Sequence, residues 1–220
     1  MLKAKIKYFF KEIFDLIYKQ KCVVCGCSKT NEILCKNCSK DVQKLSPYAQ
    51  RIISSVQIFS AYKYENSIKT LIKNLKFNHA KRGAVACAEL LFDYYKNLNL
   101  NIDTKNTIIV PVPSHPIRVF ARGYCHLELI VKEFSKLCEI EYDFNFIKKV
   151  KNTRPQYKLK INQRAKNVRG AFKLNLDNKT DKTILLIDDL VTTGATLEEI
   201  IKEIKTHKNN KIIVLTIACA

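Results

Sequence analysis

The chain has 220 residues, of which 47% are hydrophobic, enough for one well-packed domain and a small additional module. Its 39 Lys and Arg residues outnumber 20 Asp and Glu residues, giving a net charge of +19. This balance favours polyanionic partners such as nucleic acid, polyphosphates or a membrane surface, and the composition excludes a disordered chain or a fibre.

The first twenty residues place apolar side chains at helical spacing and predict an amphipathic helix. Lys11, Glu12 and Asp15 interrupt the apolar run, so it does not read as a secretion signal. Such a helix packs on its own domain or lies on a membrane surface, and both interpretations stay open. No run in the sequence reaches the roughly 18 apolar residues of a membrane-spanning helix. We therefore expect a soluble, cytoplasmic protein.

Four of the nine cysteines form two Cys-x2-Cys pairs, separated by nine residues: Cys22, Cys25, Cys35 and Cys38. Each pair can direct two thiolates at one ion, and together they complete a tetrahedral shell. The spacing predicts a structural zinc site, with an iron–sulfur cluster as the alternative. Because four thiolates close the shell, the metal is expected to stabilise the fold and not to catalyse. Cys27 is expected to be a bystander.

Beyond this cluster, Pro47 marks a plausible boundary, which divides the chain into 1–46 (amphipathic helix and four-cysteine zinc module) and 47–220 (main domain). Apolar strands then alternate with amphipathic helices, which predicts an α/β domain with a mainly parallel sheet covered on both faces. Ligands of such folds bind outside the carboxyl ends of the strands. The expected strands are Val56–Tyr64, Thr107–Val110, Thr183–Ile187 and Lys211–Ile217, and the expected helices are Asn66–Phe77, Gly83–Tyr95, Tyr124–Cys138 and Leu197–Thr206.

The segment Thr183–Thr196 carries the strongest functional signal. A buried strand delivers Asp188 and Asp189 to the sheet edge, where carboxylates accept hydrogen bonds from vicinal hydroxyls. A turn rich in Thr and Gly then opens a helix, whose N-terminal N–H groups and dipole favour a phosphate. Gly194 allows the backbone to approach the phosphate closely. Diol-binding acids followed by a phosphate cradle match a ribose 5-phosphate.

Competing phosphate-binding motifs are absent from the sequence. There is no G-x-x-x-x-G-K-[ST] and no G-x-G-x-x-G, which excludes a P-loop and a dinucleotide-binding turn. A receiver domain also has an acidic pair at a strand end, but it would need a further strand downstream, and only about thirty residues remain. The plain alternative is a strand end with Thr capping the next helix.

At these residues the sequence resembles the type I phosphoribosyltransferase fold, and more closely the ComF family of competence-associated proteins. The segments PVPSHPIRVFARGY and QRAKNVRGAF, together with the four cysteines, carry the family resemblance. One departure is Cys125, which stands where the family usually has Asn.

The resemblance implies binding of phosphoribosyl pyrophosphate with Mg²⁺. It implies that Asp188 and Asp189 contact the ribose hydroxyls and that the turn at Pro113 and Ser114 lies near the pyrophosphate. The remaining loop residues are expected to hold the 5-phosphate: Thr192, Thr193, Gly194, Ala195 and Thr196. It also implies an association with DNA uptake and natural transformation, with single-stranded DNA or the helicase and processing proteins of uptake as partners.

Phosphoribosyl transfer needs charge stabilisation of the leaving pyrophosphate more than covalent help. Arg118 and Arg122 could neutralise it, or could be a solvated charge pair. We expect Asp188, Asp189 and Arg122 to be the catalytic residues. The block Phe146–Lys173 is basic, with ten Lys and Arg and no acid. Three roles stay open for it: closing over the site, contacting a nucleic-acid backbone, or forming a solvated loop. Three functions stay open: a transferase with an unidentified acceptor, an accessory DNA-binding factor that uses the pocket for sensing, and an interaction module with a vestigial pocket.

Overall fold

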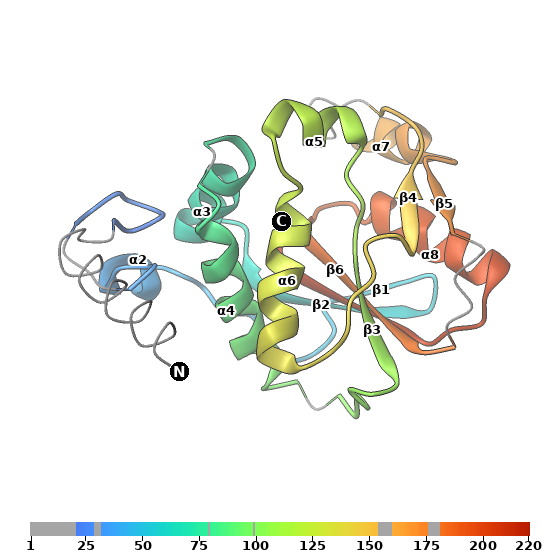
Figure 1. The fold of residues 1–220 in the computed structure, drawn as a ribbon, viewed down its shortest axis with the longest axis horizontal. Coiled ribbons are helices and arrows are strands. Elements are labelled where there is room, and N and C mark those ends of the chain that lie inside the picture. The colour runs from blue at the N-terminus through green and yellow to red at the C-terminus, as the bar shows by residue number, and fades with distance from the viewer. Residues whose placement is uncertain (1–20, 29–31, 79, 99, 154–159, 176–180) are drawn as a thin grey trace, which may run out of the picture.

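The computed structural model describes residues 21–28, 32–78, 80–98, 100–153, 160–175 and 181–220, and the predicted N-terminal helix lies outside them. The elements carry the labels of Figure 1. In chain order they are α2 (Lys36–Lys40), β1 (Arg51–Ile53), β2 (Val56–Lys63), α3 (Asn66–Phe77), α4 (Gly83–Tyr95), β3 (Thr107–Pro111), α5 (Pro116–Arg122), α6 (His126–Cys138), β4 (Ile147–Lys149), α7 (Ile161–Val168), β5 (Phe172–Leu174), β6 (Thr183–Val191), α8 (Ala195–His207) and β7 (Ile212–Cys219).

Within the described residues, the main sheet has five strands in the order β1-β2-β7-β6-β3. β1 pairs antiparallel with β2, and the other pairs are parallel. The strands β3 and β6 are almost continuously apolar and buried because helices cover both faces of the sheet. The predicted mainly parallel α/β fold is confirmed.

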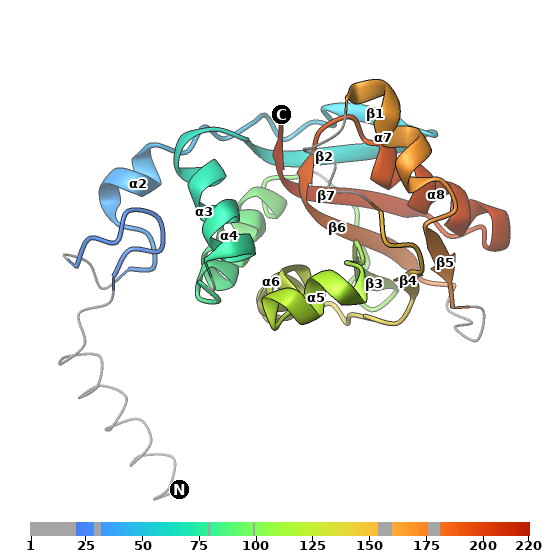
Figure 2. The ribbon, with the colours of Figure 1, turned by 90° about the horizontal axis from the view of Figure 1, so that it is seen from above.

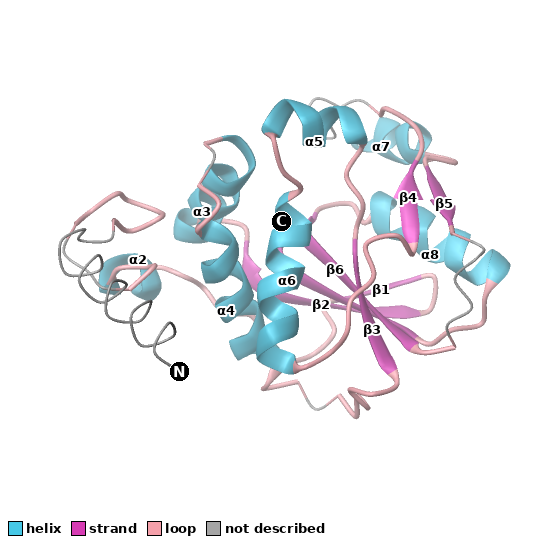
Figure 3. Ribbon diagram, in the orientation of Figure 1, coloured by secondary structure: helices cyan, strands magenta, loops and turns pink. Residues whose placement is uncertain are grey.

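The helices form two layers around the sheet, as Figures 2 and 3 show. α3, α4 and α6 lie on one face, and α8 lies on the other. Both α5 and α7 lie near the carboxyl edge in Figure 1, but Figure 2 places them on opposite sides of the sheet. Helices α5 and α7 therefore lie on either side of the carboxyl ends of β3 and β6.

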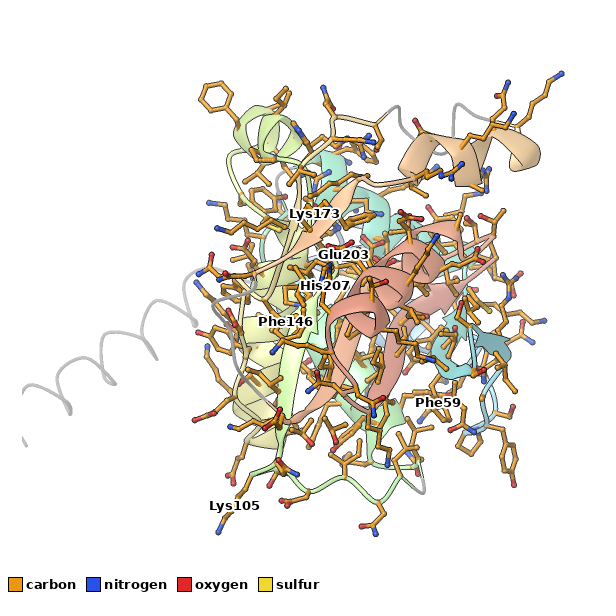
Figure 4. The ribbon with its side chains drawn as sticks, turned by 90° about the vertical axis from the view of Figure 1, so that its right-hand side faces the viewer. Phe59, Lys105, Phe146, Lys173, Glu203 and His207 are labelled. Atoms are coloured by element: carbon orange, nitrogen blue, oxygen red, sulfur yellow. The ribbon has the colours of Figure 1, made fainter. Side chains whose placement is uncertain are left out.

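Much of the predicted basic block is ordered structure. β4 and β5 form an antiparallel pair, and α7 packs beside α8. Glu203 of α8 accepts a hydrogen bond of 3.2 Å from the backbone N–H of Leu174, and it lies between Lys173 and His207 (Figure 4). Glu199 of α8 also accepts from the backbone N–H of Gly170 at 2.5 Å, so two acidic side chains of α8 hold this basic segment.

The N-terminal cysteines form a small cluster of their own, apart from the main core. α3 contacts this module through Asn74, whose amide donates to the carbonyl of Val23 at 2.8 Å. Among the residues that the structure describes, no helix is long and apolar enough to cross a membrane.

Candidate functional site

The strand that carries the acidic pair is longer than predicted. β6 runs to Val191, because Leu190 and Val191 continue the parallel register with Ala218 and Cys219 of β7. Asp188 and Asp189 therefore lie inside the last part of the strand, 8% and 4% exposed. Since successive strand residues point to opposite faces, the two carboxylates face different surroundings.

The turn after β6 has the geometry that the sequence predicted. Gly194 has a φ of 82° and is the N-cap of α8. Its backbone lies so close to Ile53 that an added Cβ would come within 2.4 Å of the Ile53 Cδ1 atom. Asp188, Thr192, Gly194 and Thr196 line a small hollow here. The first-turn N–H groups of α8 have no carbonyl of their own helix to bond, which makes this hollow suitable for a phosphate.

Two arginines hold the turn through Thr192. Arg51 of β1 donates to the Thr192 carbonyl, and Arg164 of α7 donates to the Thr192 hydroxyl at 3.1 Å. The predicted loop residues Thr193, Ala195 and Thr196 lie in the same turn, where the N–H of Ala195 donates to the Thr193 hydroxyl at 3.4 Å. Positive charge thus flanks the hollow from two sides, which favours an anionic ligand.

Asp189 has two strong partners on the helical face that α3 and α6 cover. Its Oδ2 atom accepts from the Lys76 ammonium at 2.7 Å and from His126 Nε2 at 2.5 Å. Neither residue was predicted from the sequence. Lys76 is one of many lysines, and His126 was read only as part of a helix. Neither carries a local signal that links it to a strand more than sixty residues away along the chain.

The pKa values of the two aspartates are shifted in opposite directions. Burial and the neighbouring Asp189 carboxylate raise the pKa of Asp188 to about 7. For Asp189, burial acts in the same direction, but Lys76 and His126 outweigh it and hold its pKa below the usual range. At neutral pH, Asp189 is therefore a carboxylate in an ion pair, whereas Asp188 carries a proton part of the time.

The loop after β3 supplies the other side of the site. Pro113 and Ser114 follow the strand end, and α5 begins with His115 capping the N–H of Ile117 at 3.3 Å. Arg118 of α5 donates to the Thr153 carbonyl at 2.5 Å, so it ties α5 to the segment that follows β4. Cys125 is the N-cap of α6, and its burial raises the pKa of its thiol.

Lys149 at the end of β4 is a basic residue of this region that the sequence did not single out. Burial and the nearby Arg118 lower its pKa to about 8, while Asp188 acts in the opposite sense. Its ammonium lies 5.3 Å from the ring centroid of Phe172. Lys149 therefore adds positive charge on the side of Asp188.

Arg122, the last residue of α5, contacts His126, which in turn contacts Asp189. Its Nη1 atom lies 2.6 Å from His126 Nδ1, and its guanidinium carbon lies 6.0 Å from the ring centroid of Phe77. The structure thus connects Arg122 to Asp189 through His126.

The four cysteines fit a tetrahedral metal ion. Their Sγ atoms lie within 4.8 Å of one another, and Cys25 and Cys35 are 3.7 Å apart. Zn–S bonds of about 2.3 Å in a tetrahedron give sulfur separations of about 3.8 Å. Gly26 has a φ of 74° and donates to the carbonyl of Cys22 at 2.9 Å, the tight turn that brings a Cys-x2-Cys pair together.

The profile of the phosphoribosyl transferase domain matches residues 74–219. This span covers the acidic pair, the turn after β6 and the parallel strands β3, β6 and β7. Strand β2 and most of helix α3 lie before it. The chain therefore belongs to the phosphoribosyl transferase domain family.

Two curated relatives show which members of this family the chain resembles. Competence protein F of Haemophilus influenzae is 26% identical over 190 residues, covering 77% of this chain and 82% of that protein. DNA utilization protein YhgH of Escherichia coli K12 is 27% identical over 186 residues, covering 83% of this chain and 76% of that protein. The resemblance to the ComF family is confirmed.

Among solved structures, a hypoxanthine-guanine phosphoribosyl transferase of L. donovani matches with a TM-score of 0.34 and 11% identity. It covers 78% of this chain and 73% of that one, and a score this low adds nothing to the fold assignment.

Proposed function

We propose that this protein binds phosphoribosyl pyrophosphate at the carboxyl edge of β3 and β6. The observation that carries the proposal is the position of Asp188 in one hollow with the turn Thr192–Thr196. A carboxylate suits the ribose hydroxyls, and the helix start beside it suits the 5-phosphate, so one ligand satisfies both.

The basic residues on the β3 side suit the pyrophosphate. In the proposed complex, the turn at Pro113 and Ser114 approaches it, and Arg118, Arg122 and Lys149 neutralise its charge. Mg²⁺ bound with the ligand would supply further charge neutralisation, and the Asp188 carboxylate is the kind of oxygen donor that this ion prefers.

Transfer of the phosphoribosyl group is the reaction that this arrangement favours. The bond from the anomeric carbon to the pyrophosphate oxygen breaks, and the electron pair leaves with pyrophosphate while an acceptor attacks that carbon. The cationic side chains stabilise the leaving group, and the acids hold the ribose in place. We propose no acceptor, since a fold alone does not specify one.

The cysteine module is proposed to be a structural zinc site within residues 1–46, followed by the phosphoribosyltransferase-like domain in 47–220. The sulfur geometry supports one tetrahedral ion with no open coordination position. Metal analysis should find one zinc per chain in the wild type and none when Cys35 and Cys38 are replaced by Ser. Iron with a visible absorption band would instead support a cluster.

The enzymatic proposal is tested in two stages. Calorimetric titration with phosphoribosyl pyrophosphate and Mg²⁺ should show saturable binding that Asp188→Asn/Asp189→Asn abolishes. Pyrophosphate release is then measured with a panel of nucleobases and amines. Binding without release for any acceptor would leave a ligand sensor and remove the transferase.

A role with DNA is the second candidate, favoured by the net charge of +19 and by the names of the two relatives, a competence protein and a DNA utilization protein. In this proposal, the protein binds incoming single-stranded DNA or proteins of the uptake machinery and uses the pocket for sensing. Because such binding would rest on phosphate contacts, its affinity should fall steeply with salt. Single-strand binding that is insensitive to salt would count against it.

A further inference from the structure

His126 is a buried histidine with a charged partner on each ring nitrogen. It is 5% exposed and begins α6. Arg122 contacts its Nδ1 atom at 2.6 Å, and Asp189 contacts its Nε2 atom at 2.5 Å. The ring therefore bridges the end of α5 and the acidic pair of β6.

The partners specify which form of the imidazole is present. A guanidinium only donates hydrogen bonds, so Nδ1 must accept from Arg122. Nε2 then carries the hydrogen and donates to the Asp189 carboxylate. A protonated ring would place two donors against each other at Nδ1. Burial, together with Lys76 and Arg122, also lowers the pKa of His126 against the opposing effect of Asp189.

The same contacts separate the roles of the two acids. Asp189 points toward α3 and α6, where Lys76 and His126 both bind its Oδ2 atom. Asp188 is one strand position away and faces the hollow of the phosphate turn. Lys76 and His126 therefore fix the position of the Asp189 side chain through its Oδ2 atom.

We propose that His126 is a positioning residue that, as a neutral Nε2–H imidazole, ties Arg122 to Asp189, so that Asp189 is anchored through its Oδ2 atom while Asp188 faces the hollow of the phosphate turn. The roles of Arg122 and Asp188 rest on the proposed binding of phosphoribosyl pyrophosphate. The bridge through His126 rests on the geometry of the protein alone.

Two matched variants test the bridge in the full chain. In His126→Gln, the amide keeps an acceptor and a donor at a spacing close to that of the two ring nitrogens. In His126→Asn, the same groups are one methylene shorter and cannot reach both partners. We expect calorimetric titration with phosphoribosyl pyrophosphate and Mg²⁺ to give a Kd within about threefold of wild type for Gln and at least about tenfold weaker for Asn. Equal affinity in both variants, whether retained or lost, would overturn the positioning role.

The acids are separated in the same titration. Asp188→Asn should lower affinity with little loss of thermal stability, whereas Asp189→Asn should lower the melting temperature because Lys76 loses its partner. The reverse pattern would overturn the assignment of roles.

A measurement without ligand keeps the inference testable if the wild type does not bind or if a variant does not fold. Nitrogen-15 NMR of the imidazoles reports the tautomer directly, with His126 assigned by its absence in His126→Gln or, if that variant does not fold, in His126→Asn. We expect neutral Nε2–H at pH 7. An imidazolium or an Nδ1–H ring would overturn the bridge. Absence of ligand binding in the wild type, with the expected tautomer present, would refute the proposed function and leave the bridge standing.

Discussion

The side-chain amide of Asn74 donates a hydrogen bond of 2.8 Å to the carbonyl of Val23, which lies between the first two residues of the four-cysteine cluster, Cys22 and Cys25. The same helix, α3, holds Asp41 through Ser67 at its start and reaches Asp189 through Lys76 near its end. α3 therefore connects the cysteine module to the acidic pair.

Loss of the metal should weaken ligand binding through α3. In Cys35→Ser/Cys38→Ser, the segment around Val23 loses its anchor, and Lys76 becomes less well placed for Asp189. We expect the Kd for phosphoribosyl pyrophosphate to rise about three- to tenfold. The variant is preferable to a chelator because a chelator would also remove Mg²⁺. An unchanged Kd in metal-free protein would show that the module and the pocket are independent.

Asn74→Ala should destabilise the protein by about 1 kcal/mol, because it removes a partly buried hydrogen bond and leaves the Val23 carbonyl without its donor. Thr70→Ala is the control on the same helix, since its hydroxyl bonds only the carbonyl of Asn66 at an exposed position. Urea denaturation measures both variants. Similar midpoints for the two would contradict the role given to Asn74.

Gly194→Ala should impair both folding and binding. Its φ of 82° strains any residue with a Cβ by about 1 kcal/mol, and the new methyl group also displaces Ile53 from the phosphate turn. Gly123→Ala is the matched control, since its φ is 78° but no atom lies within 4 Å of the added Cβ. We expect similar losses of stability from the backbone strain in both, and at least about tenfold weaker ligand binding only for Gly194→Ala.

The raised pKa of Asp188 predicts a pH-dependent stability. Between its unfolded value of 3.8 and its folded value of about 7, the native state holds a proton that the unfolded state has released. The contribution of Asp188 to the free energy of unfolding therefore falls as pH rises through this window. Asp188→Asn, which mimics the protonated acid, should gain stability relative to wild type by on the order of 2 kcal/mol between pH 4.5 and pH 7.5. Denaturation at both pH values measures this, and a constant difference would contradict it.

Helices and strands could be predicted where the local sequence pattern is strong. Contacts between residues far apart in the chain could not. Asn66–Phe77 and Gly83–Tyr95 were predicted with the observed bounds, and in Asn66–Phe77 the apolar side chains recur on one face of the helix. The strand of Thr183–Ile187 was predicted too short, since carboxylates are typical of loops, although Asp188, Leu190 and Val191 continue the pairing with β7.

The partners of the acidic pair show why the rest of the site escaped prediction. Lys76 and His126 reach Asp189 only because α3 and α6 cover the same face of the sheet, a tertiary relation with no local pattern. The short elements β4, α7 and β5 were read as one basic block, because their charges outnumber the few apolar residues that pack against α8. Cytoplasmic location and the domain boundary at 46/47 stay predictions.

Parallel titrations with phosphoribosyl pyrophosphate, ribose 5-phosphate and pyrophosphate, each with Mg²⁺, test the central claim most directly. The account predicts that phosphoribosyl pyrophosphate binds most tightly, because it alone engages the acids, the phosphate turn and the basic residues of the β3 side together. Asp188→Asn should weaken its binding and leave that of pyrophosphate almost unchanged. Absence of binding, or pyrophosphate binding as tightly as the whole ligand, would mean that the positive charge attracts any polyanion and that the pocket is not a phosphoribosyl site.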